Sequence, residues 1–268
     1  MKFDLILSGV GGQGILSIAF ITDNSAMKQG LYFKQSEVHG MAQRGGAVSS
    51  HLRVADHEIF SDLVPLGHAN MLLSVEPMEA LRYEEFLGEG GTVVSSTASF
   101  ENIGDYPPVE TILKRLGDFP RLVLVNGNKI AREAGSGRAQ NMVILGAAAP
   151  YLPLEQAVME EFIGVLFGKK GEKMIQTNVK AFRYGLANGK FYANAMEVKA
   201  DPTKILAVMD RLDSGSLEPE AAGAWARILD SDHWAPMVEW WDGQKRVRFP
   251  GDVATAERIL AEGHAFLA

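Results

Sequence analysis

Cysteine is absent from the 268-residue sequence. Without thiols the chain cannot form disulfides, ligate zinc or an iron–sulfur cluster through cysteine, or use a cysteine nucleophile. Any redox reaction of the protein must therefore move its electrons through a cofactor or a partner. Long apolar runs are lacking too: none approaches the roughly 20 residues of a membrane span. Asp4 also interrupts the N-terminal apolar run, unlike a signal peptide, so we expect a cytoplasmic protein.

Positive charge is in short supply, with 26 Lys and Arg against 33 Asp and Glu and a net charge of −7. A general attraction to nucleic acid or anionic lipid is therefore not expected. The composition is otherwise that of a globular protein, 47% apolar and 22% charged, which excludes disorder as the main theme. The length fits one large α/β domain, or a domain of about 200 residues with an appendage.

The chain opens with the pattern of a βαβ unit: an apolar run at residues 3–8, a glycine-rich turn and helix-like spacing up to Gly30. Further strands are expected at residues 31–34, 47–54, 69–75, 92–96 and 122–125, with a hairpin partner for the second of these at 58–60. Helices are expected at residues 77–86, 129–134, 141–149, 154–167, 172–187 and 253–266. This alternation predicts a three-layer α/β/α, Rossmann-like sandwich with a mixed, mainly parallel sheet.

The character of the sequence changes near Asp201 and Pro202. We therefore expect an α/β domain over residues 1–200 and a helical C-terminal extension over residues 201–268. The extension contains all four tryptophans, at positions 225, 234, 240 and 241. Tryptophan is enriched at interface hot spots, which favours a docking surface, but a small helical core that buries the indoles explains them equally.

A glycine loop follows the first strand. Gly9, Gly11 and Gly14 match G-x-G-x-x-G between a strand and a helix. Glycines let the backbone approach a phosphate, and the free amides and dipole at the helix start attract an anion. Close strand–helix packing explains the same pattern without a ligand. A dinucleotide site also needs an acidic residue about 20 residues later, at the end of an apolar strand. Glu37 is near that distance but does not end an apolar strand, and this weakens the interpretation as an NAD site.

A second polar motif, SEVHGMAQRGG, occupies residues 36–46. Arg44 could hold a phosphate or carboxylate through two hydrogen bonds, and Glu37 and His39 could exchange protons. Pairing of these charges within the loop or with another subunit is the alternative. No metal site is expected, because the spacing of the four nearby histidines matches no ligand motif: they are His39, His51, His57 and His68.

Together, GVGGQG at residues 9–14 and SEVHGMAQRGG at residues 36–46 resemble the gamma-type domain of 2-oxoacid:ferredoxin oxidoreductases, in particular the separate beta subunits of the indolepyruvate enzymes. The resemblance covers roughly residues 1–200. It implies a large alpha subunit that carries thiamine diphosphate, magnesium and [4Fe-4S] clusters. The complex would decarboxylate a 2-oxoacid, indolepyruvate or another arylpyruvate, oxidatively to an acyl-CoA and reduce ferredoxin or another acceptor.

The resemblance also implies that this chain is inactive alone, holds no catalytic or metal-binding residue and contacts coenzyme A. Its candidate binding residues are Gly9, Gly11, Gly12, Gln13, Gly14, Glu37, His39, Gln43, Arg44, Gly45 and Gly46. Among them, three glycines (11, 12 and 14) would allow backbone approach, Gln13 would contact ligand or partner, and Arg44 would hold an anionic group. Two alternatives remain: a stand-alone NAD(P)-dependent dehydrogenase of Rossmann type, and a non-catalytic scaffold.

Overall fold

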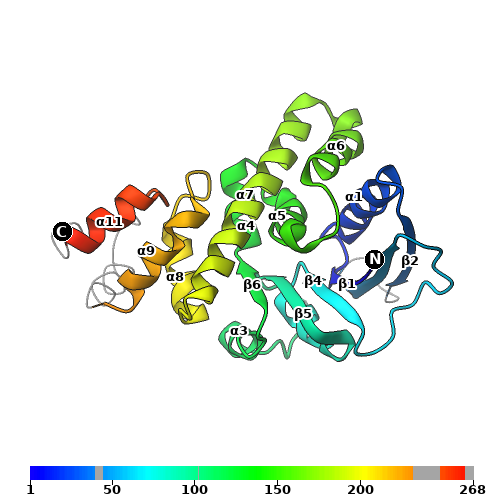
Figure 1. Ribbon diagram of the computed structural model, residues 1–268, viewed down its shortest axis with the longest axis horizontal. Helices are drawn as coiled ribbons and strands as arrows, with labels where there is room; N and C mark the ends of the chain where they lie inside the picture. The colour runs from blue at the N-terminus through cyan, green and yellow to red at the C-terminus, as the bar shows by residue number, and fades with distance from the viewer. Residues whose placement is uncertain (40–44, 102, 232–247, 263–268) are drawn as a thin grey trace. The chain divides into compact units, whose positions relative to one another are not determined.

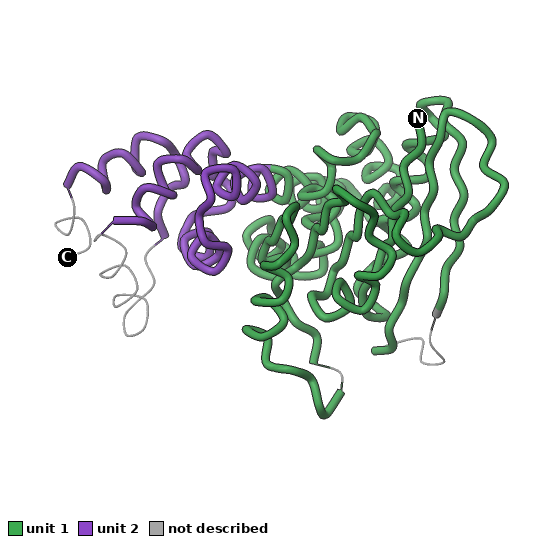
Figure 2. The backbone as a smooth tube through the Cα atoms, turned by 60° about the horizontal axis from the view of Figure 1, so that its bottom comes forward, with its two compact units in different colours: residues 1–186 green, residues 187–268 purple. Residues whose placement is uncertain are grey.

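The computed structural model describes residues 1–39, 45–101, 103–231 and 248–262. The chain forms two compact units, Met1–Leu186 and Ala187–Ala268, which Figure 2 shows in different colours. The boundary between them falls within helix α7 (Glu172–Glu197), whereas the division expected from composition lies at residue 200.

A six-stranded mixed sheet forms the centre of the first unit, with strand order β2-β3-β1-β4-β5-β6. Its strands are β1 (Lys2–Val10), β2 (Tyr32–His39), β3 (Ala47–Ala55), β4 (Ala69–Ser74), β5 (Leu87–Ser96) and β6 (Leu122–Val125). β1, β4, β5 and β6 pair in parallel, while β3 lies antiparallel between β1 and β2. The predicted mixed, mainly parallel sheet is confirmed. Strands β1, β4 and β6 are largely buried apolar runs, as expected for a sheet covered on both faces.

Two local predictions at the β2–β3 edge are wrong. β2 continues to His39 instead of ending at Lys34, because an edge strand with one face exposed to solvent can carry polar side chains. Residues 58–60 form no strand, so the expected hairpin between them and β3 is absent. β3 pairs instead with β1 and β2. Arg53 holds the carbonyl groups of Ser61 and Leu63, so the chain crosses the sheet face after β3.

Helices cover both faces of the sheet (Figure 1). On one side α1 (Ile15–Lys28) packs against α5 (Gln140–Ala148) and α6 (Gln156–Phe167), and on the other α2 (Pro77–Arg82) packs against α3 (Val109–Leu116). α4 (Gly127–Ala134) follows β6, and short 3₁₀ turns lie at residues 84–86, 137–139, 149–151 and 168–170. The three-layer architecture is that expected from the sequence, although α3 has no counterpart among the predicted helices.

Helices α5 and α7 cross at two glycines. A Cβ atom on Gly146 would lie 2.0 Å from the carbonyl oxygen of Phe182, and one on Gly185 would lie 2.0 Å from that of Val143. Real Cβ atoms do not approach so closely, so only glycine allows the two backbones to pack here. This crossing fixes α5, whose first turn contributes Asn141 to the site described below.

The second unit is helical in its described part, with α8 (Pro202–Arg211), η5 (Pro219–Ala221), α9 (Ala222–Leu229) and α11 (Val253–Glu262). α9 packs against both α8 and α11. Trp225 of α9 is fully buried, so this indole belongs to the core of the unit. Trp234, Trp240 and Trp241 lie outside the described residues. Within the described ranges, every helix is too short or too polar to cross a membrane.

Candidate functional site

The carboxyl ends of β1 and β4 form a topological switch point. The chain leaves β1 into α1, which packs with α5 and α6, and leaves β4 into α2, which packs with α3 on the other face of the sheet. In open α/β sheets, ligands bind in the crevice that such a divergence creates. The two strand ends are tied together: Ser8 Oγ donates to Ser74 Oγ at 3.0 Å, and the Val75 N–H donates to the Ser8 carbonyl at 3.0 Å.

The glycine loop between β1 and α1 is closed by its own glutamine. The Gln13 N–H donates to the Val10 carbonyl at 3.0 Å, and the Val10 N–H donates to Gln13 Oε1 at 2.8 Å. Gln13 is buried. Its side chain therefore shapes the loop, a role that the sequence pattern did not indicate. Gly9 gives close packing: a Cβ there would lie 2.7 Å from Ile15 Cδ1.

Two other glycines serve backbone conformation. Gly12 has φ +101° and Gly14 has φ +83°, in the region that other residues avoid. Gly12 borders open space, whereas a Cβ on Gly14 would lie 2.4 Å from Asn141 Nδ2, which donates to the Gly14 carbonyl at 3.1 Å. Among the described residues, no side chain caps α1 and its first turn carries no acidic residue. The positive end of the helix is therefore available to an anion.

The second motif reaches the glycine loop through its terminal glycines. The Gly11 N–H donates to the Gly46 carbonyl at 2.8 Å, and the Gly45 N–H donates to the Gly11 carbonyl at 3.2 Å. The structure thus brings together the two motifs from which the site was predicted. His39 ends β2 opposite Val48, while Gln43 and Arg44 lie outside the described residues.

A cavity of about 240 Å³ lies beside the glycine loop. Three glycines (11, 12 and 14) and four apolar side chains line it together with Glu37; the apolar residues are Val10, Ile15, Leu16 and Val48. Glu37 belongs to strand β2 and not, as expected, to a loop. Its carboxylate can accept from hydroxyl groups, while the α1 amides favour an anion. The cavity is smaller than a typical small-molecule site, so it suits one part of a larger ligand.

Sequence analysis did not identify Glu76, a carboxylate at the switch point. Glu76 is fully buried and accepts from the Glu79 N–H at 2.9 Å, from the Phe100 N–H at 3.3 Å and from the Tyr106 hydroxyl. Burial and the neighbouring Glu76 carboxylate raise the pKa of Tyr106. Glu76 therefore fastens the chain that follows β5 to the edge of the crevice. An acidic residue before Pro77, directly after an apolar strand, was the available signal of a helix cap.

The histidines that lie close in sequence have separate surroundings. His51 Nδ1 accepts from the Val64 N–H at 3.1 Å, and burial lowers the pKa of His51. His57 pairs instead with Asp56 at the exposed end of β3. Among the residues that the structure describes, no three His, Asp or Glu side chains are grouped so that they could hold a metal ion.

Comparison with known proteins identifies the family. Residues 4–188 match the model of the pyruvate ferredoxin/flavodoxin oxidoreductase family. The chain belongs to this family. Its relatives include the indolepyruvate oxidoreductase subunit IorB of Archaeoglobus fulgidus, 35% identical over 69% of this chain and 94% of the relative. The subunit of the same name from Methanothermobacter thermautotrophicus is 36% identical over 69% of this chain and 96% of its own.

A solved structure has the same fold. The 2-oxoglutarate:ferredoxin oxidoreductase of Magnetococcus marinus, with 2-oxoglutarate, coenzyme A and succinyl-CoA bound, superposes with a TM-score of 0.58 at 21% identity. The match covers 70% of this chain and 31% of the Magnetococcus chain, so the present chain spans about a third of that protein. The resemblance stated from the two motifs is confirmed.

The strand order differs from that of a dinucleotide-binding dehydrogenase. In that fold the second strand lies beside the first, and its terminal acidic residue reaches the ribose. Here β3 separates β2 from β1, and β2 forms the edge of the sheet. The glycine motif alone therefore gives little support to the dehydrogenase alternative.

Proposed function

We propose that the chain is the smaller, cluster-free subunit of a thiamine diphosphate-dependent 2-oxoacid:ferredoxin oxidoreductase that uses indolepyruvate or another arylpyruvate. A larger alpha subunit would carry thiamine diphosphate, magnesium and the [4Fe-4S] clusters. One observation carries this proposal: the match covers 94% of a relative that is named as a subunit of indolepyruvate oxidoreductase. The absence of cysteine is compatible with it, because clusters are ordinarily ligated by thiolates.

The test of this role is complex formation. The full chain, tagged, is co-expressed with the thiamine-binding, cysteine-rich subunit encoded in the same genome, and the product is analysed by size exclusion. We expect co-elution at a fixed stoichiometry, with 2-oxoacid oxidation in the complex and none in the chain alone. A chain that oxidises a 2-oxoacid unaided, or that stays separate from the alpha subunit, would contradict the proposal.

We further propose that the cavity beside the glycine loop contacts coenzyme A. The backbone amides at the start of α1 can donate to a phosphate, and the Glu37 carboxylate can accept from ribose hydroxyls. The nucleotide part of coenzyme A contains both groups. The cavity also lies next to the switch point, where ligands of α/β sheets bind. The size of the cavity fits contact with one part of the coenzyme, leaving the rest to the alpha subunit.

Leu16 offers a matched test of this contact, because it is exposed in the first turn of α1 and lines the cavity. Leu16→Asp and Leu16→Asn differ in charge but hardly in shape, and the helix start tolerates both. A unit charge about 7 Å from a phosphate at an effective dielectric of about 40 raises the KM for coenzyme A roughly 5- to 10-fold. We expect that rise for Leu16→Asp relative to Leu16→Asn in the complex. Equal KM values for the two variants would show that coenzyme A does not bind in this cavity.

A further inference from the structure

Large apolar side chains are exposed along the β2–β3 edge of the sheet. Phe60, in the segment that follows β3, is 87% exposed, and Leu63 of the same segment is also exposed. Tyr32 and Val38 of β2 are exposed as well. We call these four residues, Tyr32, Val38, Phe60 and Leu63, the Phe60 surface.

Strand register places these side chains on one face of the sheet. Lys34 of β2 and Asp4 of β1 both lie opposite Arg53 of β3, and directly paired side chains point to the same face. Because side chains alternate along a strand, Tyr32 and Val38 share the face of Lys34. Arg53 also lines a cavity of about 370 Å³ together with Phe60, so the segment after β3 lies over the same face.

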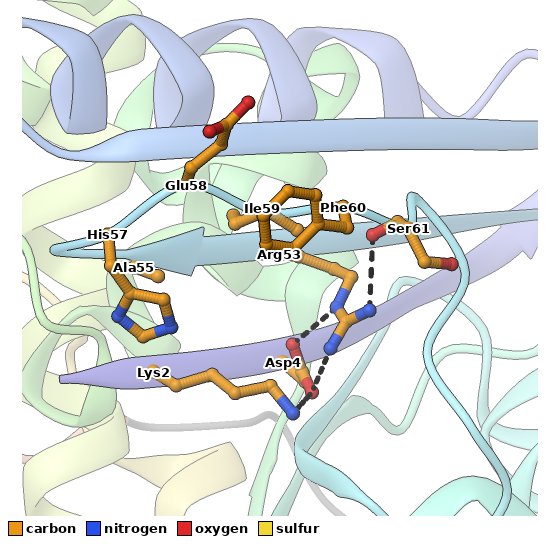
Figure 3. Close-up of a pocket in the computed structure, with 9 residues that line it drawn as sticks. All are labelled: Lys2, Asp4, Arg53, Ala55, His57, Glu58, Ile59, Phe60 and Ser61. Atoms are coloured by element: carbon orange, nitrogen blue, oxygen red, sulfur yellow. Dashed lines mark hydrogen bonds and ion pairs between the residues drawn. The ribbon is translucent and has the colours of Figure 1, made fainter.

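The apolar side chains of the segment are exposed, but its backbone is hydrogen-bonded to Arg53 (Figure 3). Arg53 Nη1 donates to the carbonyls of Ser61 at 3.1 Å and Leu63 at 2.9 Å. The same guanidinium donates to both carboxylate oxygens of buried Asp4, at 2.8 and 3.2 Å. Nearby, the N–H of buried Val64 donates to His51. A buried ion pair contributes little net stability, so its clearest effect here is to position the segment.

Firm anchoring with exposed apolar side chains is typical of a protein interface. A segment that only connects two strands is expected to carry small or polar residues at its surface. Clustered large apolar side chains in contact with solvent mark binding surfaces, and aromatic residues concentrate at the centre of such surfaces. The cavity beside Phe60 offers space for a side chain of a partner.

We propose that the Phe60 surface docks against an apolar surface of the larger subunit of the oxidoreductase; this rests on the function proposed above. The matching fold makes up 31% of the longer Magnetococcus chain, where it is covalently joined to the remainder. A separate chain of this fold must hold the corresponding partner through its surface alone. Glu37 alternates with Val38 and faces the glycine-loop cavity from the opposite side of β2, so docking leaves that cavity accessible.

The experiment measures the affinity of the purified full chain for the purified larger subunit by biolayer interferometry. We expect Phe60→Ser to raise Kd at least tenfold, and the double variant with Leu63→Ser at least a hundredfold. Val165→Ser is the matched control, because Val165 is 57% exposed on α6, away from this surface, and should change Kd less than twofold. Hydrogen exchange in the complex should protect residues 58–64 and leave α6 unchanged.

The outcomes separate this proposal from the one beneath it. If the wild-type chain binds the larger subunit and the serine variants bind equally well, the docking surface is wrong while the proposed function stands. If the wild-type chain does not bind at all, both fail. Sedimentation could also show a dimer of this chain that Phe60→Ser dissociates, with no change in the Kd for the larger subunit. The surface would then bind a second copy of the chain, and the proposal is overturned.

Discussion

Gly14→Ala perturbs the glycine loop at a point where the structure allows the cost to be calculated. The φ of +83° imposes roughly 1–2 kcal/mol on a residue with a Cβ. The new Cβ would also lie 2.4 Å from Asn141 Nδ2, displacing the side chain whose hydrogen bond to Gly14 contributes about 1 kcal/mol. Reduced entropy of the unfolded chain returns about 0.5 kcal/mol. The net loss is about 2 kcal/mol, or a fall in Tm of roughly 4–8 °C.

Gly12→Ala is the control, because Gly12 has φ +101° but no atom within 4 Å of the added Cβ. Its loss is that of the backbone alone, about 1 kcal/mol. In an Asn141→Ala background the cost of Gly14→Ala should fall to the same level, as a double-mutant cycle by urea unfolding measures. If Gly14→Ala and Gly12→Ala cost the same in the wild-type background, the contact between Asn141 and the glycine loop is refuted.

Three further predictions follow from other parts of the first unit. Gly146→Ala should cost about 3 kcal/mol at the α5–α7 crossing, whereas Gly164→Ala, with ordinary space on α6, should gain about 0.5–1 kcal/mol in the same urea titration. Burial raises the pKa of Asp23 to about 7; the native state therefore binds the proton more tightly and loses stability as pH rises from about 4 to 7. Asp23→Asn should remove this loss in the free energy of unfolding, up to about 4 kcal/mol. Equal pH profiles of stability for the wild type and the variant would contradict the prediction. Glu37→Gln should raise the KM for coenzyme A roughly tenfold in the complex if ribose hydroxyls donate to the carboxylate, and a lower KM would place a phosphate there instead.

The glycine loop could be predicted because its signals are local. A strand, three glycines at fixed spacing and the start of a helix are adjacent in sequence. Gly11 and Gly14 lie in the predicted loop, whereas Gly9 belongs to β1, which continues to Val10. The role of Gln13 could not be read in the same way. A glutamine that satisfies the backbone of its own loop leaves no pattern to distinguish it from one that contacts a ligand.

The β2–β3 edge was harder to predict from the sequence, because the residues that pair there are not close together along the chain. Lys34, Ser36 and Glu37 interrupt the apolar alternation of β2, and only their pairing with β3 shows that the strand continues. The hydrogen bonds between Gly11 and residues 45–46 likewise join segments more than 30 residues apart. Glu76 is a different case, since a local helix-cap signal was present before Pro77.

Reconstitution of activity tests the central claim most directly. The purified larger subunit is titrated with this chain, and coenzyme A-dependent oxidation of indolepyruvate is followed through reduction of ferredoxin or a viologen dye. The account predicts a rate that rises with added chain and saturates at a fixed molar ratio, with none from this chain alone. Full activity of the larger subunit without this chain, or oxidation by this chain alone, would contradict it.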